Sequence, residues 1–154
     1  MSGESSRHDG APLHHRRPGC DAHRGVWTPI ARLWLLPMNL STSRYADYRP
    51  EWGIAIRTTV GRPRWFPHPY VHARHCTPYG VFGVYDDEAE HRAAYIARLD
   101  RHGDDVIAEI NDITDGEGGT LLCYCRLDLA RSFCHRLFLA QWIETRHGLY
   151  SLRR

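Results

Sequence analysis

Apolar and polar side chains alternate in the segment from residue 52 to residue 60, which is the period of a β-strand with one buried face. Its apolar or β-branched residues stand at every second position: Ile54, Ile56, Thr58 and Val60. Residues 39–43 have the composition of a second, shorter strand. The nearly continuous apolar run at residues 120–125 is typical of a central strand that is covered on both faces.

Helical spacing appears in three later segments. Apolar residues recur at helical positions after Asp86 and Asp87, which can cap a helix that ends at Gly103. Asp104 begins a second helix with one apolar face, and a third, largely apolar helix is predicted for residues 133–146. The order strand, strand, helix, helix, strand, helix predicts a small layered α/β fold with parallel strands.

The hydrophobic pattern places a single domain at residues 38–150, with a short tail at residues 151–154. Residues 1–37 have no sustained helical or strand period and are rich in Gly, Pro, His, Arg and Ser. Two interpretations are open for this segment: a disordered basic tail, or an upstream extension of a protein whose translation begins at Met38. We recognise no secretory signal and no apolar run of the roughly 18 residues that a membrane span needs.

Charge and cysteine usage narrow the functional classes. The net charge of +2 argues against bulk electrostatic wrapping of nucleic acid but allows a local basic pocket. All 20 basic residues are arginine, so lysine Schiff-base chemistry is excluded. Five unevenly spaced cysteines without an export signal fit a reducing compartment, and we expect a cytoplasmic protein.

The residues Cys134, His135 and Arg136 open the third predicted helix and form the main candidate site. The first turn of a helix has unpaired N–H groups and a positive dipole end, and an arginine there adds a planar fork for phosphate or carboxylate. Positive potential would also favour a Cys134 thiolate, which could act as a nucleophile with His135 as proton carrier. The alternative is structural: Cys134 packs as a small hydrophobe, and His135 and Arg136 bind loop carbonyls.

A metal interpretation uses Cys123 and Cys125, whose side chains share one face of the predicted strand, together with Cys134 and His135. Structural zinc usually takes a wider C-x2-C spacing, and two cysteines on a central strand are more often core residues. The sequence therefore predicts no metal and no other cofactor.

A second candidate patch follows the strand at residues 52–60. Arg62 and Arg64 flank a proline and stand next to Trp65, so that guanidinium groups and an indole could hold a phosphate and stack on a base. The long segment at residues 66–85 is rich in Pro, Gly, His and aromatic residues, and Tyr79 in it could close over the same pocket. The alternative is a solvated loop whose tryptophan covers the core.

Three pieces of the chain resemble the family called domain of unknown function 488. The strand Leu121-Leu122-Cys123-Tyr124 followed by Cys134-His135-Arg136 resembles the family signature, and Gly61-Arg62-Pro63-Arg64-Trp65 is similar to its basic-aromatic loop. Ser41-Thr42-Ser43 resembles its opening and adds Ser43 to the candidate ligand-binding residues. The resemblance implies a Rossmann-like three-layer sandwich with these residues at one end of the sheet. Cys125 departs from the pattern, since an acidic or polar residue is common there.

Two functional hypotheses follow. The first is that the protein binds a phosphate-bearing ligand, a nucleotide or a nucleic-acid end, at Arg136. This hypothesis includes an enzyme of nucleotide or nucleic-acid processing, in which Cys134 and His135 would lie nearest the reacting bond. The second is a non-catalytic module that binds nucleic acid or protein through the aromatic loop at residues 66–85. The sequence leaves the oligomeric state open and predicts no membrane partner.

Overall fold

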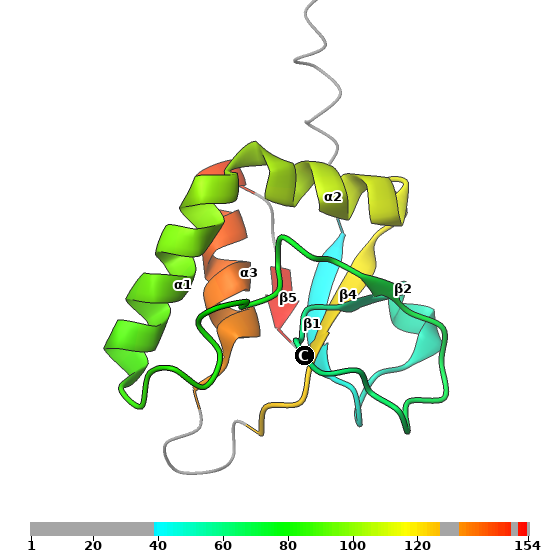
Figure 1. Ribbon diagram of the computed structural model, residues 1–154. Coiled ribbons are helices and arrows are strands. Elements are labelled where there is room, and N and C mark those ends of the chain that lie inside the picture. The colour runs from blue at the N-terminus through cyan, green and yellow to red at the C-terminus, as the bar shows by residue number, and fades with distance from the viewer. Residues whose placement is uncertain (1–38, 127–132, 149–150, 154) are drawn as a thin grey trace, which may run out of the picture. The chain divides into compact units, whose positions relative to one another are not determined.

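A computed structural model describes residues 39–126, 133–148 and 151–153, so that the predictions for residues 1–37 lie outside the described part of the chain. Five strands form one sheet in the order β3-β2-β4-β1-β5, and every pairing in it is parallel (Figure 1). The strands are β1 (Leu40–Arg44), β2 (Ile54–Arg57), β3 (Val71–His72), β4 (Gly119–Cys123) and β5 (Ser151–Arg153).

Two neighbouring interior strands, β1 and β4, come from distant parts of the described chain. β1 lies beside β4, with Leu40 opposite Gly119 and Arg44 opposite Cys123. The sheet is tightly packed at its amino end, because a Cβ on Gly118 would lie 2.6 Å from the carbonyl oxygen of Asn39. The parallel arrangement brings the carboxyl ends of β1, β2 and β4 to one edge, where ligands of open α/β sheets usually bind.

Three helices cover one face of the sheet: α1 (Glu88–His102), α2 (Asp104–Thr114) and α3 (His135–His147). The side chain of Asp87 caps α1 by accepting a hydrogen bond from the backbone N–H of Glu90, as predicted for an acidic residue at that point. α1 lies against α3 and α2 crosses their ends (Figure 1). All three helices contribute to one apolar core on this face, which includes Leu40, Ile56 and Leu121.

The opposite face of the sheet is covered by loop aromatics. Ala55 and Leu122 pack there against Tyr45 and Phe66 in a second, smaller core. A short 3₁₀-helix, η2 (Pro50–Trp52), lies in the connection between β1 and β2. The predicted α/β fold with parallel strands is thus confirmed. Among the described residues, aromatic side chains from loops cover this second face of the sheet.

The strand boundaries differ from the predictions in several places. β2 is shorter at both ends than the predicted strand at residues 52–60, and it begins after Gly53, whose φ of 91° leaves the extended conformation. β4 covers residues 119–123 instead of 120–125, so Cys125 lies beyond the strand. Val71–His72 pairs with β2 inside the segment predicted to be a loop. Residues 151–153 pair with β1 as β5, where the sequence predicted only a tail. Among the described residues no helix combines the length and apolarity needed to span a membrane.

Candidate anion and thiol site

The candidate site lies where β4 ends and α3 begins. The helix begins at His135, two residues later than the start predicted from the apolar pattern, and Cys134 is its N-cap residue with an extended backbone. Cys134, His135 and Arg136 are all buried, since their exposed fractions are 1%, 5% and 2%. The predicted cluster therefore does open the helix, but inside the protein rather than on its surface.

Three thiols gather at this point. Cys123 ends β4 on the same face as Leu121, toward the helices, and Cys125 follows two residues later. The Cys123 and Cys134 sulfur atoms are 3.1 Å apart, and the backbone N–H of Cys125 donates to the Cys123 sulfur at 3.3 Å. All three sulfur atoms lie within 4.8 Å of one another.

The arrangement favours a thiolate at Cys134. The Cys134 and Cys123 sulfur atoms are within hydrogen-bonding distance, and hydrogen bonding with the Cys123 thiol is the main reason that the pKa of Cys134 is lowered. Hydrogen bonding with the Cys125 thiol and the positive charge of Arg136 lower the same pKa further, against the opposing effect of burial. Hydrogen bonding with Cys125 and Cys134, together with burial, raises the pKa of Cys123, so that this thiol keeps its own proton.

Arg136 is buried with part of its guanidinium group unpaired. No described residue accepts a hydrogen bond from its Nε or Nη1 atom. Thr42 lies on the helix-facing side of β1, opposite Leu121, and its buried hydroxyl also lacks a partner among the described residues. α3, which carries Arg136 in its first turn, packs against both β1 and β4. Unpaired buried polar groups are costly, and each needs a physical explanation.

His135 connects the start of α3 to the end of β2. Its Nε2 atom donates to the carbonyl oxygen of Thr58 at 2.9 Å and lies 3.2 Å from the Thr58 hydroxyl. That hydroxyl in turn donates to the carbonyl oxygen of Leu122 at 2.9 Å. Burial lowers the pKa of His135 and favours the neutral ring. With Nε2 engaged in this way, the geometry describes an anchor between two strands and a helix; the catalytic roles of His135 and Cys134 stay predictions.

The arginine loop lies at a different part of the sheet edge. Arg62 and Arg64 are exposed, and the charge of Arg62 acts on His72 of the edge strand β3. Tyr79 also belongs to this region, with its ring 6.2 Å from that of His72. Within the described residues, electrostatic contacts place the charge of Arg62 near His72 and that of Arg136 near the thiols, and none of these contacts joins the two groups.

Trp65 and Ser43 lie on the aromatic side of the sheet. Trp65 is 59% exposed and its ring is 6.5 Å from that of Tyr124, directly after Cys123. Ser43 is buried and donates to the carbonyl oxygen of Arg44, on the face of β1 opposite to Thr42. The hydroxyl group that faces the helices is thus that of Thr42. Strand alternation puts Thr42 and Ser43 on opposite faces, but the sequence did not show which face the helices cover.

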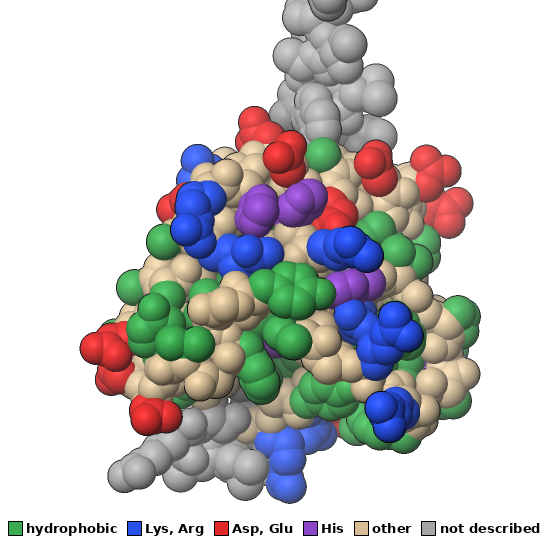
Figure 2. All heavy atoms as spheres, viewed as in Figure 1, with side chains coloured by type: hydrophobic (Ala, Val, Ile, Leu, Met, Phe, Trp, Pro, Cys, Tyr) green, Lys and Arg blue, Asp and Glu red, His purple; other side chains and the backbone are tan. Residues whose placement is uncertain are grey.

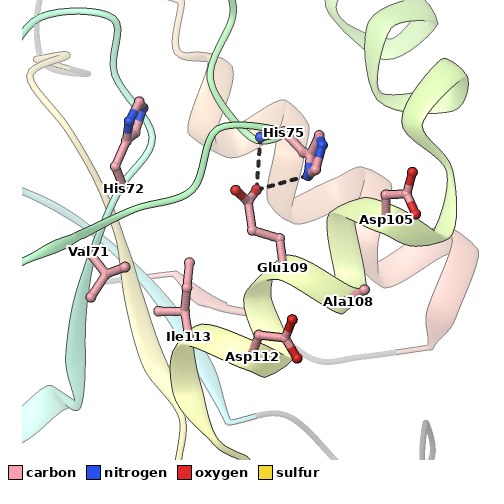
Figure 3. A pocket seen from close by; sticks show the side chains of 8 residues that line it. All are labelled: Val71, His72, His75, Asp105, Ala108, Glu109, Asp112 and Ile113. Atoms are coloured by element: carbon pink, nitrogen blue, oxygen red, sulfur yellow. Dashed lines mark hydrogen bonds and ion pairs between the residues drawn. The ribbon is translucent and has the colours of Figure 1, made fainter.

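A separate hollow of about 560 Å³ lies between β3 and α2 (Figure 3). Glu109 points into it from α2 and accepts hydrogen bonds from the backbone N–H groups of Arg74, at 2.7 Å, and His75, at 2.8 Å. The imidazole of His75 lies 3.3 Å from the same carboxylate. Because both carboxylate oxygens are occupied by the loop, Glu109 fastens the segment after β3 to α2.

A comparison of the chain with protein-family models, with curated proteins and with solved structures found no match. The resemblance to the domain of unknown function 488 family accordingly stays a prediction from the sequence, and the functional argument depends on the site itself.

Proposed function

We propose that the protein binds a phosphate-bearing ligand at the start of α3, with Arg136 as its principal contact. The observation that carries this proposal is the buried guanidinium group whose Nε and Nη1 atoms find no acceptor among the described side chains and carbonyls. A buried charge is expensive unless it is paired, and guanidinium N–H groups form charge-assisted hydrogen bonds to the oxygen atoms of a phosphate or carboxylate.

Two neighbouring features favour the same ligand. The first turn of α3 contributes backbone N–H groups and the positive end of a helix dipole of 13 residues. The hydroxyl of Thr42 is a further buried group without a partner in the described structure, and it can donate to a phosphate oxygen. Together these groups supply donors of the type that a tetrahedral oxyanion accepts.

An aromatic surface near the same edge favours a nucleotide over a simple phosphate. Trp65 and Tyr124 are 59% and 41% exposed, and both pack against the ring of Tyr45. Tyr124 is the residue after Cys123, so this surface adjoins the end of β4. A base that stacks on an exposed indole gains about 1–3 kcal/mol, which inorganic phosphate cannot obtain.

The test compares inorganic phosphate, a nucleoside and the corresponding nucleoside monophosphate by isothermal titration calorimetry. We expect the monophosphate to bind most tightly, and Arg136→Met to lower its affinity by about tenfold to a hundredfold, because a charge-assisted hydrogen bond is worth about 1.5–3 kcal/mol. The matched control is Arg146→Met, which changes an exposed arginine of the same helix. Equal binding by the Arg136 variant and the wild type would contradict the proposal.

A second candidate function is nucleic-acid binding by the surface around β3. Figure 2 shows a band of arginine and histidine side chains on this face, next to exposed hydrophobic ones. Burial lowers the pKa of His72, and the positive charges of Arg57, Arg74 and Arg62 lower it further, so these groups lie near one another. Phe82 is 65% exposed in the same long segment. Positive charge interleaved with exposed aromatic rings is the combination that single-stranded nucleic acid recognises.

Fluorescence anisotropy with a labelled single-stranded oligonucleotide tests this candidate. Changing Arg62 and Arg64 together to alanine should weaken binding and reduce its salt dependence, because each lost phosphate contact lowers the slope. The control changes Arg92 and Arg146, which alters the net charge equally but on other elements. Equal losses in both double variants would indicate a nonspecific charge effect and exclude this surface.

A further inference from the structure

Cys123, Cys125 and Cys134 present three sulfur ligands from two segments that meet at one corner of the fold. Their sulfur atoms lie within 4.8 Å of one another. In a tetrahedral zinc site with bonds of about 2.3 Å, neighbouring sulfur atoms are about 3.8 Å apart, so the thiols need only small side-chain shifts to surround an ion. The C-x-C spacing, which argued against a zinc knuckle in the sequence, places one thiol at the last residue of β4 and the second just beyond it, and Cys134 supplies the third.

The candidate for a fourth ligand is His91, which comes from a different element, is not a member of the three-thiol cluster, and lies near enough for Cys134 to act on it electrostatically. It lies on α1, is 5% exposed, and its buried Nδ1 atom has no hydrogen-bond partner in the part of the chain that the structure describes. Its ring centroid is 4.9 Å from that of Phe133, the residue before Cys134. A neutral imidazole nitrogen without a partner is costly to bury, and a metal ion is one group that satisfies it.

The charge of the surroundings suits such a site. Three thiolates and one divalent ion carry a net single negative charge, which is expensive to bury alone. Arg136 is the second residue of α3, and its charge acts on both Cys134 and Cys125. The positive end of α3 adds to the same effect. The described residues thus provide both the ligands and the compensating charge.

The geometry points to a zinc site formed by Cys123, Cys125, Cys134 and His91, which ties the β4–α3 corner to α1. The mixed set of three sulfur atoms and one imidazole is a donor set that Zn²⁺ accepts in structural sites. Binding displaces the remaining thiol protons into solvent and uses the neutral lone pair of His91. The two sites share Arg136 and the start of α3 as a source of positive charge, but their ligand residues differ, because Cys125 and His91 take no part in the anion site.

The test uses the full chain, reduced and stripped of metal with a chelator, and titrated with Co²⁺ as a spectroscopic probe. We expect one ion per chain, with the near-ultraviolet sulfur-to-cobalt charge-transfer band and the intense visible bands of tetrahedral Co²⁺, and displacement by Zn²⁺. Cys125→Ser and His91→Ala should each lower the affinity by about tenfold or more, while Cys76→Ala, at a buried cysteine outside the cluster, leaves it unchanged.

Two results would overturn the proposed zinc site. A fully reduced wild type without the charge-transfer band overturns the site, and so does unchanged binding in the Cys125 variant. Unchanged binding in the His91 variant overturns the four-ligand arrangement. Circular dichroism of each stripped variant checks that it is folded; should Cys125→Ser be unfolded, Cys125→Ala replaces it. Loss of Co²⁺ binding with intact nucleotide binding in Cys125→Ser shows that the metal and the proposed function are separate properties.

Discussion

Replacing Arg136 by methionine should make the ligand-free protein more stable, although it removes the central group of the proposed anion site. Methionine retains most of the buried aliphatic stem and is a good helix former, so little packing is lost. Arg136 is only 2% exposed, and the Nε and Nη1 atoms of its guanidinium group have no hydrogen-bond partner among the described residues. The substitution removes this buried group.

The magnitude follows from the unpaired atoms. An unsatisfied buried donor costs about 1–3 kcal/mol, and replacing buried charged groups by apolar ones of similar size is neutral or stabilising by up to about 4 kcal/mol. We therefore expect Arg136→Met to raise the free energy of unfolding by about 1–3 kcal/mol. With a urea m-value of about 2 kcal/mol/M, the midpoint rises by about 0.5–1.5 M.

The assay is urea unfolding followed by tryptophan fluorescence and circular dichroism, in phosphate-free buffer that contains a chelator. Arg146→Met, whose partner Asp100 is exposed, provides the matched control and should change the free energy by less than about 1 kcal/mol. A loss of more than about 1 kcal/mol in Arg136→Met would refute the reasoning, since it would mean that the guanidinium group already has stabilising partners. Adding the monophosphate should then stabilise the wild type and leave the variant unchanged.

Three further predictions concern the core, the sheet and the aromatic surface. Tyr95→Phe removes a buried hydrogen bond of 2.5 Å to the carbonyl oxygen of Cys76 and should lower the free energy of unfolding by about 1–2 kcal/mol in the same urea assay; an unchanged midpoint would contradict it. Gly118→Ala should destabilise by more than about 1 kcal/mol, because φ is +100° and its Cβ would meet the Asn39 carbonyl at 2.6 Å; thermal unfolding measures this, and an unaltered Tm would disprove the strain. Trp65→Ala should weaken nucleotide binding by about tenfold in calorimetry while leaving phosphate binding unchanged, and equal losses for both ligands would exclude base stacking.

The fold was predictable where hydrophobic period and capping agree. The acid at position 87 and the apolar spacing after it predict α1, and the apolar run before position 123 predicts β4. β3 and β5 escaped prediction because strands of two and three residues contain too few positions to show alternation. Their pairing depends on neighbouring strands, which a local pattern does not record.

The site was predictable in one part only. A helix start with cysteine, histidine and arginine indicated the position of the proposed anion site, and Arg136 is buried at that helix start. The proximity of Arg62 to His72 depends on the pairing of β3 with β2, which the local pattern does not show. His91 gave no sequence signal, because a single histidine on a charged helix is ordinarily a surface residue; α1 packs against α3, and Cys134 acts on His91 electrostatically.

The pairing of β1 with β4 has a consequence for how the protein folds. The hydrogen bond between Ser41 and Thr120 joins residues 79 positions apart, so the seam between these strands closes only after nearly the whole described domain has been gathered. Thr42 stands near the start of the chain segment enclosed by this strand pairing, and Arg136 follows its end. An oxyanion bound by both residues would link β1 to α3, and we expect it to slow the dissociation of β1 from the sheet and to protect the intervening loops from proteolysis.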